Sequence, residues 1–346
     1  MKICVVGAGS IGGYVGVKLA LAGHEVTLIA RGANLAAIRA NGMRLRADGI
    51  EHIARNVRAT DDLREAGPQD VVILGMKAHQ VEAVCDRLDA LMHEDTLVVP
   101  MQNGIPWWYF QRHGGPHDGR RVETVDPNGR LAAAIDPRRI IGCVVYPACE
   151  LAAPGVVHHI EGDRFPLGEI DGSRTERVER LSAAFVGAGL KAPVLDNIRA
   201  EIWLKLWGNL TFNPISALTH STLVDICQFP QTREVAASMM REAESVARSL
   251  GITFRVSLEK RIAGAEKVGK HKTSMLQDVE AGRDPEIDAL VGSVIELGRL
   301  VGVPTPHIDT VFAMVKLLGR RMQEERVYIR AHPFDMPAPR AVGQAG

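Results

Sequence analysis

One stretch decides the fold of this chain: Lys2-Ile3-Cys4-Val5-Val6-Gly7-Ala8-Gly9-Ser10-Ile11-Gly12. Its apolar first half predicts a short buried strand, and residues 15–22 predict the helix that follows. Between them, Gly7 permits a tight turn, Gly9 lets the backbone approach a pyrophosphate, and Gly12 lets helix and strand pack closely. The glycine pattern alone is weak evidence, but a strand before it and a helix after it indicate a dinucleotide-binding turn. A glycine-rich turn that binds no ligand is the alternative.

The second strand, expected at residues 26–30, indicates which dinucleotide is bound. An Asp or Glu at its carboxyl end would hold the ribose 2′-hydroxyl of NAD. This sequence has Ala30 and Arg31 there, and its next carboxylate is Asp48. A guanidinium suits a 2′-phosphate instead, because it forms charge-assisted bonds to phosphate oxygens. We therefore expect NADP (NADPH) as the cofactor. A solvated surface arginine is the alternative interpretation of Arg31.

Composition excludes several classes of partner. The 346 residues are 46% hydrophobic and 24% charged, as in ordinary soluble proteins. The 41 basic and 41 acidic residues cancel, so no overall field attracts nucleic acid or a membrane. The first strand begins so close to Met1 that we expect no signal peptide, and no apolar stretch reaches the ~18 residues of a membrane span. Five cysteines without a CxxC pair predict buried thiols in a reducing cytoplasm and no metal site.

The chain divides into two parts of different character. Strands and helices alternate up to about residue 196, and the apolar runs at 70–74 and 96–100 are typical of buried parallel strands. Antiparallel additions to the sheet edge are expected at 140–146, 155–160, 165–168 and 192–195. From 198 to 326 the periodicity is helical. The predicted fold class is therefore α/β, with a Rossmann-type dinucleotide-binding domain at 1–196, an all-α domain at 197–330 and a mobile tail at 331–346.

Two apolar segments leave alternatives open. Four consecutive aromatic residues, 107–110, stand in the loop-rich stretch 106–137. They could form a lid or pocket wall, fill a hydrophobic gap, or meet a partner subunit. The apolar helices at 287–318 could pair with a second copy in a homodimer, or they could close the core of their own domain.

Two candidate site residues follow strands of the predicted sheet. Lys77 comes shortly after the strand at 70–74, and Asn103 comes shortly after the strand at 96–100. Ligands of open α/β sheets bind beyond the carboxyl ends of the strands, so both side chains are expected near the cofactor. A solvated lysine and a simple turn asparagine are the alternatives.

A third candidate group lies on one predicted helix. Lys205, Asn209 and Asn213 recur every four residues, so they lie nearly in one row on the helix surface. Trp203 and Trp207 make the same helix too apolar for an ordinary surface helix. A cation among such residues needs a partner or a function. A solvated polar stripe is the alternative.

Two residues farther along are ambiguous when taken alone. Ser274 with Gln277 fits a capping box at the start of a helix, and Glu286 fits an acid in the first turn of the next helix. These structural interpretations are favoured for each residue by itself. The spacing does not bring Glu286 near Lys205.

Taken together, these residues resemble the ketopantoate reductase (2-dehydropantoate 2-reductase) family. The resemblance covers residues 3–288 and extends over the helices beyond them. Each motif alone is unspecific, but the combination is highly specific. It comprises Gly7-x-Gly9-x-x-Gly12, Arg31, Lys77, Gln102-Asn103-Gly104, Lys205-x-x-x-Asn209-x-x-x-Asn213-Pro214, Ser274-Met275-Leu276-Gln277-Asp278 and Glu286-Ile287-Asp288.

The resemblance implies a role for each matching residue, in a cleft between the two domains. Lys205 would be the general acid and Glu286 would orient the substrate and support proton transfer. Substrate would be held by Asn103, Asn209, Asn213 and Ser274. The cofactor would be held by Gly7, Ala8, Gly9, Ser10, Ile11, Gly12, Arg31, Lys77 and Asn103.

The implied activity is NADPH-dependent reduction of 2-dehydropantoate, a small 2-keto acid, to (R)-pantoate in pantothenate and coenzyme A biosynthesis in the cytoplasm. Two departures from better-known members bear on substrate choice: His271 stands where Asn is frequent, and the loop at 107–139 is longer. A reductase of another branched or aromatic 2-keto acid is one alternative. A non-catalytic NADP-binding sensor is the other.

Overall fold

The computed structural model describes residues 1–332, so nearly all of the tail predicted at 331–346 lies outside the described residues. A parallel sheet of five strands forms the first half of the chain, in the order β5-β2-β1-β6-β7. The strands are β1 (Lys2–Val6), β2 (Glu25–Ile29), β5 (Arg58–Thr60), β6 (Val71–Leu74) and β7 (Leu97–Pro100). The helices of this half are α1 (Ser10–Leu21), α2 (Gly32–Asn41), α3 (Leu63–Ala66), α4 (Ala78–Val81), η1 (Cys85–Leu91), α5 (Arg130–Ala134), η2 (Pro137–Arg139) and α6 (Glu176–Gly187). Strands alternating with helices around a parallel sheet confirm the predicted Rossmann-type architecture.

A second sheet was not predicted. It has four strands in the order β4-β3-β10-β9, with bounds β3 (Met43–Ala47), β4 (Ile50–Ala54), β9 (Ala148–Ala153) and β10 (Val156–Glu161). The expectation that 155–160 extends the main sheet was therefore wrong, because β10 pairs in parallel with β3. β8 (Ile141–Cys143) and β11 (Leu167–Glu169) do form an antiparallel pair, whereas 192–195 contributes only an isolated bridge at Val194.

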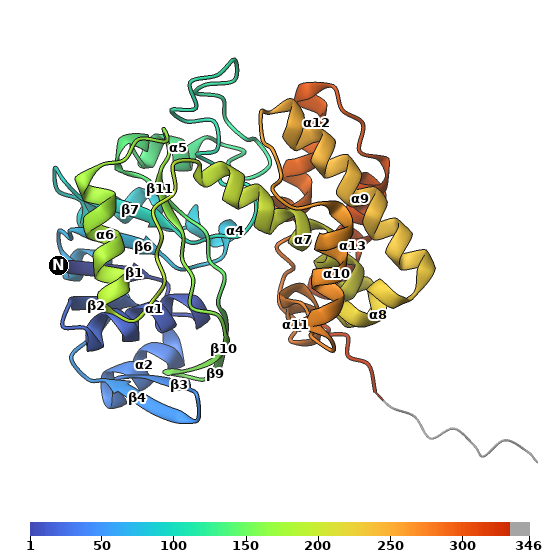
Figure 1. Cartoon of the computed structure of the whole chain (residues 1–346). Coiled ribbons are helices and arrows are strands. Elements are labelled where there is room, and N and C mark those ends of the chain that lie inside the picture. Colours follow the sequence, from blue (N-terminus) through green and yellow to red (C-terminus); the bar gives the residue numbers. More distant parts are fainter. Residues whose placement is uncertain (333–346) are drawn as a thin grey trace, which may run out of the picture.

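The second half of the chain is helical, as predicted. Its helices are α7 (Ile198–Thr219), α8 (Leu223–Gln228), α9 (Pro230–Ser249), α10 (Leu258–Val268), α11 (Ser274–Glu280), η3 (Asp288–Gly292, a π-helix), α12 (Ser293–Val301) and α13 (Pro306–Glu325). We call residues 1–196 the sheet region and 197–330 the helical region. Figure 1 shows α7 running from one region into the other. The capping prediction for α11 was wrong by one residue: Thr273 accepts the bond from the Leu276 N–H, and Ser274 is the first helical residue.

The apolar residues of η3, α12 and α13 mostly close the core of the helical region. Leu290, Val294 and Val315 are buried there. Leu317 is 66% exposed and Met314 is half-exposed, so α13 also presents apolar surface outward. Pairing of two copies stays a prediction. Within residues 1–332, no helix is long and apolar enough to cross a membrane.

The aromatic segment 107–110 is part of the core that joins the two regions. All four side chains are buried. Arg199 of α7 donates to the carbonyls of Tyr109 and Gln111, and the Trp203 indole donates to the Tyr109 hydroxyl at 2.7 Å. Of the alternatives left open by the sequence, the structure supports the filling of a hydrophobic gap. Trp108 also lines a pocket, described below.

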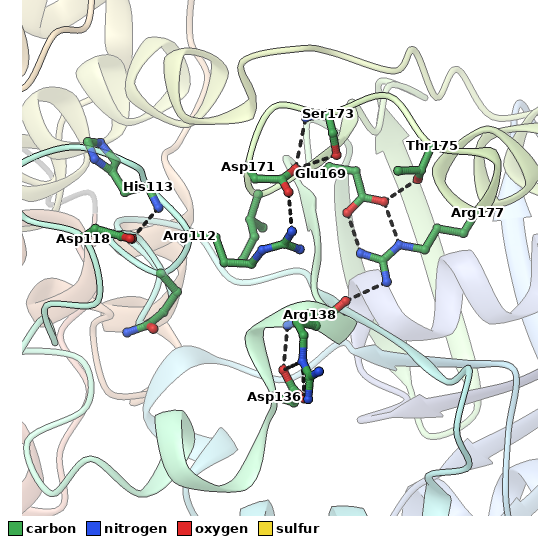
Figure 2. A network of polar contacts seen from close by, with 12 residues as sticks. Arg112, His113, Asp118, Asp136, Arg138, Glu169, Asp171, Ser173, Thr175 and Arg177 are labelled. Carbon is green, nitrogen blue, oxygen red and sulfur yellow. Dashed lines mark hydrogen bonds and ion pairs between the residues drawn. The ribbon is translucent and has the colours of Figure 1, made fainter.

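A polar network fixes the outer end of the same loop. Figure 2 shows Arg112 paired with Asp171, which follows β11, and the buried carboxylate of Glu169 held by Arg177 and Thr175. Arg177 also donates to the carbonyl of Arg138 at 2.6 Å. These contacts attach the stretch 106–137 to the sheet region near its start, at Arg112, and just after its end, at Arg138. The aromatic segment is therefore held in place against α7.

Candidate active site

The glycine turn between β1 and α1 has two structural glycines and one that faces open space. Gly7 adopts φ +103°, a conformation that side chains rarely tolerate. A Cβ at Gly12 would lie 2.1 Å from the Gly7 carbonyl oxygen, so only glycine fits there. A Cβ at Gly9 would meet no atom within 4 Å. The fold therefore needs Gly7 and Gly12, whereas Gly9 keeps the space above the turn clear for a ligand.

This open space lies at the N-terminus of α1, where backbone N–H groups lack partners within the helix. Gly9 is the N-cap and provides no side-chain bond, and the first turn contains no acidic residue. Such a helix end attracts an anion. Binding of a dinucleotide pyrophosphate at this turn stays a prediction.

Arg31 lies just after β2, beside the same crevice. Its backbone forms the N-cap of α2, and its side chain is exposed. Gly7 and Ala8 both donate to the carbonyl of Ile29 at the end of β2, which places the β2 end next to the glycine turn. A role of this exposed guanidinium in cofactor binding stays a prediction.

A pocket between the two regions contains three of the predicted site residues. Lys205 and Asn209 line it from α7, and Asn103 lines it from the segment after β7. Further lining residues come from both regions: Pro100, Gln102, Gly104, Pro106, Trp108, Cys143, Val144, Val145, Ile202 and Leu206. The structure thus brings the end of the parallel sheet and the polar row of α7 to one place.

The ammonium of Lys205 is held by two acceptors. It donates to Asn103 Oδ1 at 2.5 Å and to the carbonyl oxygen of Val145. An ammonium has three N–H donors, so one remains for a ligand. Burial lowers the pKa of Lys205 to about 8 from its ordinary 10.5, with Cys143 and Glu286 acting in the opposite direction. A lysine with this pKa is mostly charged at neutral pH and gives up a proton easily.

The segment that carries Asn103 is fixed by the helical region. Ile105 N–H donates to the carbonyl of Ala289 at 2.9 Å. Gly104 has φ +89°, and a Cβ there would lie 2.1 Å from that same carbonyl oxygen. Ala289 belongs to the π-helix η3, and such turns recur at functional sites. Gly104 therefore lets Asn103 approach Lys205, because the backbones of the two regions can come into direct contact there.

The segment of Lys77 and Ala78 contacts Asp278 and Glu286 of the helical region. Lys77 Nζ contacts Asp278 Oδ2 at 2.7 Å, and Asp278 Oδ1 also accepts from Arg283. The N–H of Ala78 donates to Glu286 Oε1 at 3.1 Å. Burial raises the pKa of Glu286, while the charge of Lys77 and the Ala78 bond oppose that change. A buried carboxyl with a shifted pKa is a candidate functional group.

Two further predicted residues, Asn213 and Ser274, contact each other but do not line the pocket. Asn213 is buried on α7 and donates to the Ser274 hydroxyl at 3.4 Å, a long hydrogen bond. Ser274 is exposed at the start of α11. The structure brings these two together, and Asn209 lies one helical turn before Asn213 on the same face.

Two groups that hold the site lysines were missed by the sequence analysis. The carbonyl of Val145 is an acceptor for the ammonium, and a backbone carbonyl gives no signal in side-chain patterns. Asp278 was recognised only as part of a motif, although it holds Lys77. The sequence could have indicated this ion pair only through the position of Asp278, an acidic residue within a short helix.

Comparison with known proteins agrees with this geometry. Family models described as "Ketopantoate reductase PanE/ApbA" and "Ketopantoate reductase PanE/ApbA C terminal" match residues 3–172 and 197–319. The chain is 55% identical to a 2-dehydropantoate 2-reductase of Mesorhizobium japonicum, over 92% of this chain and 98% of the relative. It is 31% identical to a 2-dehydropantoate 2-reductase of Pyrococcus horikoshii, over 91% and 97%.

A solved structure gives the same result. A protein of Ralstonia solanacearum, provisionally assigned as a ketopantoate reductase, superposes with a TM-score of 0.89 at 43% identity, covering 92% of this chain and 98% of that one. The two family models together cover most of the chain, from the glycine turn to α13. This protein therefore belongs to the ketopantoate reductase family.

Proposed function

We propose that this protein reduces 2-dehydropantoate to (R)-pantoate with NADPH, a step of pantothenate and coenzyme A biosynthesis. The relative that is 55% identical over nearly its whole length carries the name of this activity. We assign residues 1–196 as the NADP-binding domain and 197–330 as the substrate domain. The cleft between them, with Lys205 facing the carboxyl ends of the strands, would be the active site.

Cofactor binding is assigned to the glycine turn, to Arg31 and to the segment of Lys77. The open space over Gly9 and the N-terminus of α1 fit the pyrophosphate. Arg31 would hold the 2′-phosphate, and Lys77 and Asn103 would border the nicotinamide. When bound, NADPH supplies the hydride to the keto carbon.

Lys205 is assigned as the general acid. Reduction of a ketone leaves negative charge on its oxygen, and an ammonium beside that oxygen both stabilises the charge and supplies the proton. Asn103 and Val145 occupy two of the three N–H groups of Lys205, so the third is available to the substrate. A pKa of about 8 keeps the group protonated at neutral pH and makes it a stronger acid than a free lysine.

Substrate holding is assigned to Asn103, Asn209, Asn213, Ser274 and Glu286. Asn103 and Asn209 line the same pocket as Lys205. Burial raises the pKa of Glu286, so its carboxyl takes up a proton more readily than an exposed glutamate does, and its Oε1 is already held by the Ala78 N–H. Asn213 and Ser274 would bind the substrate carboxylate at the outer end of the row.

The observation that carries the proposal is the ammonium of Lys205, which comes from the helical region and is held by two acceptors of the sheet region, Asn103 and Val145. Steady-state turnover of 2-dehydropantoate with NADPH and with NADH tests it, beside a panel of branched and aromatic 2-keto acids. We expect kcat/KM to be highest for 2-dehydropantoate with NADPH. Equal or higher values for another keto acid would overturn the substrate, and no NADPH oxidation with any of them would leave a non-catalytic sensor.

Localisation and assembly are part of the proposal. We place the protein in the cytoplasm, because its five cysteines are free thiols and four of them are buried. We also propose a homodimer, in which the exposed side chains of Met314 and Leu317 on α13 would be covered. Sedimentation of the wild type and of Leu317→Lys at equal concentration tests it: a monomeric wild type would contradict the dimer.

A further inference from the structure

The pocket of Lys205 contains an indole whose N–H has no partner. Trp108 lines the pocket and is 1% exposed. Its Nε1 is buried without a hydrogen-bond partner among residues 1–332. A buried donor left unpaired is destabilising, so such groups are rare in folded proteins unless a ligand or water supplies the acceptor.

Two other buried tryptophans show that the fold can satisfy such a group. Trp203 donates to the hydroxyl of Tyr109 at 2.7 Å, and Trp207 donates to the carbonyl of Met240 at 2.8 Å. Both are as deeply buried as Trp108. Of these three indoles, the one without a partner borders the pocket, which indicates that its acceptor comes from a molecule bound there.

The indole of Trp108 is held in place by its surroundings. A Cβ added at Gly142 would lie 3.0 Å from the edge of the ring, so the strand β8 packs directly against it. The guanidinium of Arg199 lies 5.8 Å from the ring centroid and is itself fixed by backbone carbonyls. A donor held this rigidly loses little conformational entropy when a ligand binds to it.

The same pocket also contains an unpaired acceptor. Gln102 donates through Nε2 to the carbonyls of Leu74 and Met76, which fixes the orientation of its amide. Its Oε1 is then left buried without a donor. The pocket therefore offers a fully buried unpaired donor and a fully buried unpaired acceptor, besides Lys205 and the side-chain amides of Asn103 and Asn209. A hydroxyl group can both accept and donate, whereas a carboxylate can only accept and would be repelled by Gln102 Oε1.

We propose that Trp108 is a specificity-determining residue, which donates its indole N–H to a hydroxyl group on the carbon chain of the 2-keto acid. The neighbouring side chains of Ile202, Leu206 and Pro106 form an apolar wall for the branched carbon next to it. This inference rests on the proposed function, since 2-dehydropantoate has one hydroxyl, at the end away from the keto acid group. A pocket built to bind a hydroxyl discriminates against the analogue that lacks it, because its own polar groups then stay unpaired.

A substrate pair and a variant pair test this proposal. The substrates are 2-dehydropantoate and 3,3-dimethyl-2-oxobutanoate, which has the same carbon skeleton without the hydroxyl. Trp108→Phe removes the N–H and keeps an aromatic ring. Trp107→Phe is the matched control, because Trp107 is the adjacent buried tryptophan and does not line the pocket.

We expect Trp108→Phe to lower kcat/KM for 2-dehydropantoate about 3–10-fold, the loss of one neutral hydrogen bond. The value for the deoxy analogue should stay within twofold of wild type, and Trp107→Phe should leave the ratio of the two substrates unchanged. A parallel fall for both substrates, or no fall for either, would overturn the role of Trp108. The kcat/KM of the wild type for the two keto acids is measured first. If the wild type reduces neither of them, the proposed function itself is wrong, whatever the variants do.

Discussion

The glycine turn and the interdomain cleft are assembled in opposite ways. Six consecutive residues, from Gly7 to Gly12, make the turn, and its tightest contact is between two of them, Gly7 and Gly12. The cleft depends on contacts between residues far apart in the chain: Lys205 with Asn103 across 102 positions, and Lys77 with Asp278 across 201. The comparison teaches that the proposed cofactor turn is formed by residues adjacent in sequence, whereas the proposed proton-transfer site depends on how the two regions pack.

The two places also differ in where their charge comes from. The turn offers backbone N–H groups and the end of α1, with no acidic side chain in the first turn. The cleft holds Lys205 and Glu286. Burial lowers the pKa of the lysine and raises the pKa of the glutamate, so in both cases it disfavours the charged form. Ionisable groups with shifted pKa values are typical of catalytic sites, so a change in the cleft should affect turnover before it affects cofactor binding.

Loss of the Lys205 ammonium should have the largest effect. We expect Lys205→Met to lower kcat by about 10²–10⁴-fold, the usual contribution of a general acid, because α7 has no second lysine to supply the proton. NADPH affinity, measured by fluorescence titration, should change less than about threefold, since the turn is untouched. Lys191→Met is the control, because Lys191 is an exposed lysine paired with Asp163. Near-normal turnover in Lys205→Met would remove this residue from the mechanism.

Changes at two glycines of the turn should separate function from folding. Gly9→Val should weaken NADPH binding by about 10–100-fold, because the side chain fills the space over the turn, and the melting temperature should hardly change. Gly12→Ala should instead lower stability by about 1–3 kcal/mol, since its Cβ meets the Gly7 carbonyl. Thermal denaturation and titration of both variants check this. If Gly9→Val melts as early as Gly12→Ala, the open space over Gly9 has no ligand role.

Arg31 should affect the choice of cofactor more than its binding overall. Arg31→Ala should weaken NADPH about tenfold or more, the loss of a charged hydrogen bond, and leave NADH nearly unchanged. Arg39→Ala, on the same helix and bonded only to the carbonyl of Ala59, is the control. The ratio of kcat/KM for the two cofactors is the measurement. Equal losses for both would contradict a 2′-phosphate role.

What the sequence could predict follows the same division. The glycine turn, Arg31 and the change to helices at Ile198 depend on residues close together, and local patterns identify them. The sheet that contains β3 and β4 was missed, because β4 is short and largely exposed and its pairing with β3 is reinforced by ion pairs such as Arg44–Glu51. Such a strand lacks the apolar alternation by which strands are found.

The contacts of the cleft could not be predicted from residue spacing. The row of Lys205, Asn209 and Asn213 was found from its period of four residues, but its partners come from other parts of the chain. Family resemblance named Asn103 and Glu286 without saying what they touch. Packing alone shows that Lys205 is held by Asn103 and Val145, and that Glu286 accepts from Ala78.

The pH dependence of the reaction should follow Lys205. The ammonium donates the proton, so kcat/KM should be highest below its pKa of about 8 and fall up to tenfold per pH unit above it. Stability has the opposite sign: the unfolded lysine stays charged up to about its ordinary 10.5, so the cost of burying the charge is relieved between pH 8 and 10.5. Wild type should therefore gain stability relative to Lys205→Met as pH rises through that window. A flat activity profile from pH 7 to 10 would contradict the assignment.

The link between Lys77 and Asp278 should have the smallest effect on turnover. Asp278 is buried at one end of the contact that joins the two sides of the cleft, and it holds both Lys77 and Arg283. Asp278→Asn keeps the shape of the side chain and removes its charge, so we expect the cleft to close less completely. KM for the keto acid should rise about 3–10-fold, because binding energy shared by the ground state and the transition state is lost. The value of kcat should stay within about twofold, because Lys205 is unchanged. Asp288→Asn breaks the exposed pair with Lys316 and should alter neither value, since exposed pairs contribute about 0–1 kcal/mol. If kcat instead falls as far as in Lys205→Met, Asp278 takes part in the chemistry itself. The packed cleft would then contain one more reacting group than Lys205 and Glu286.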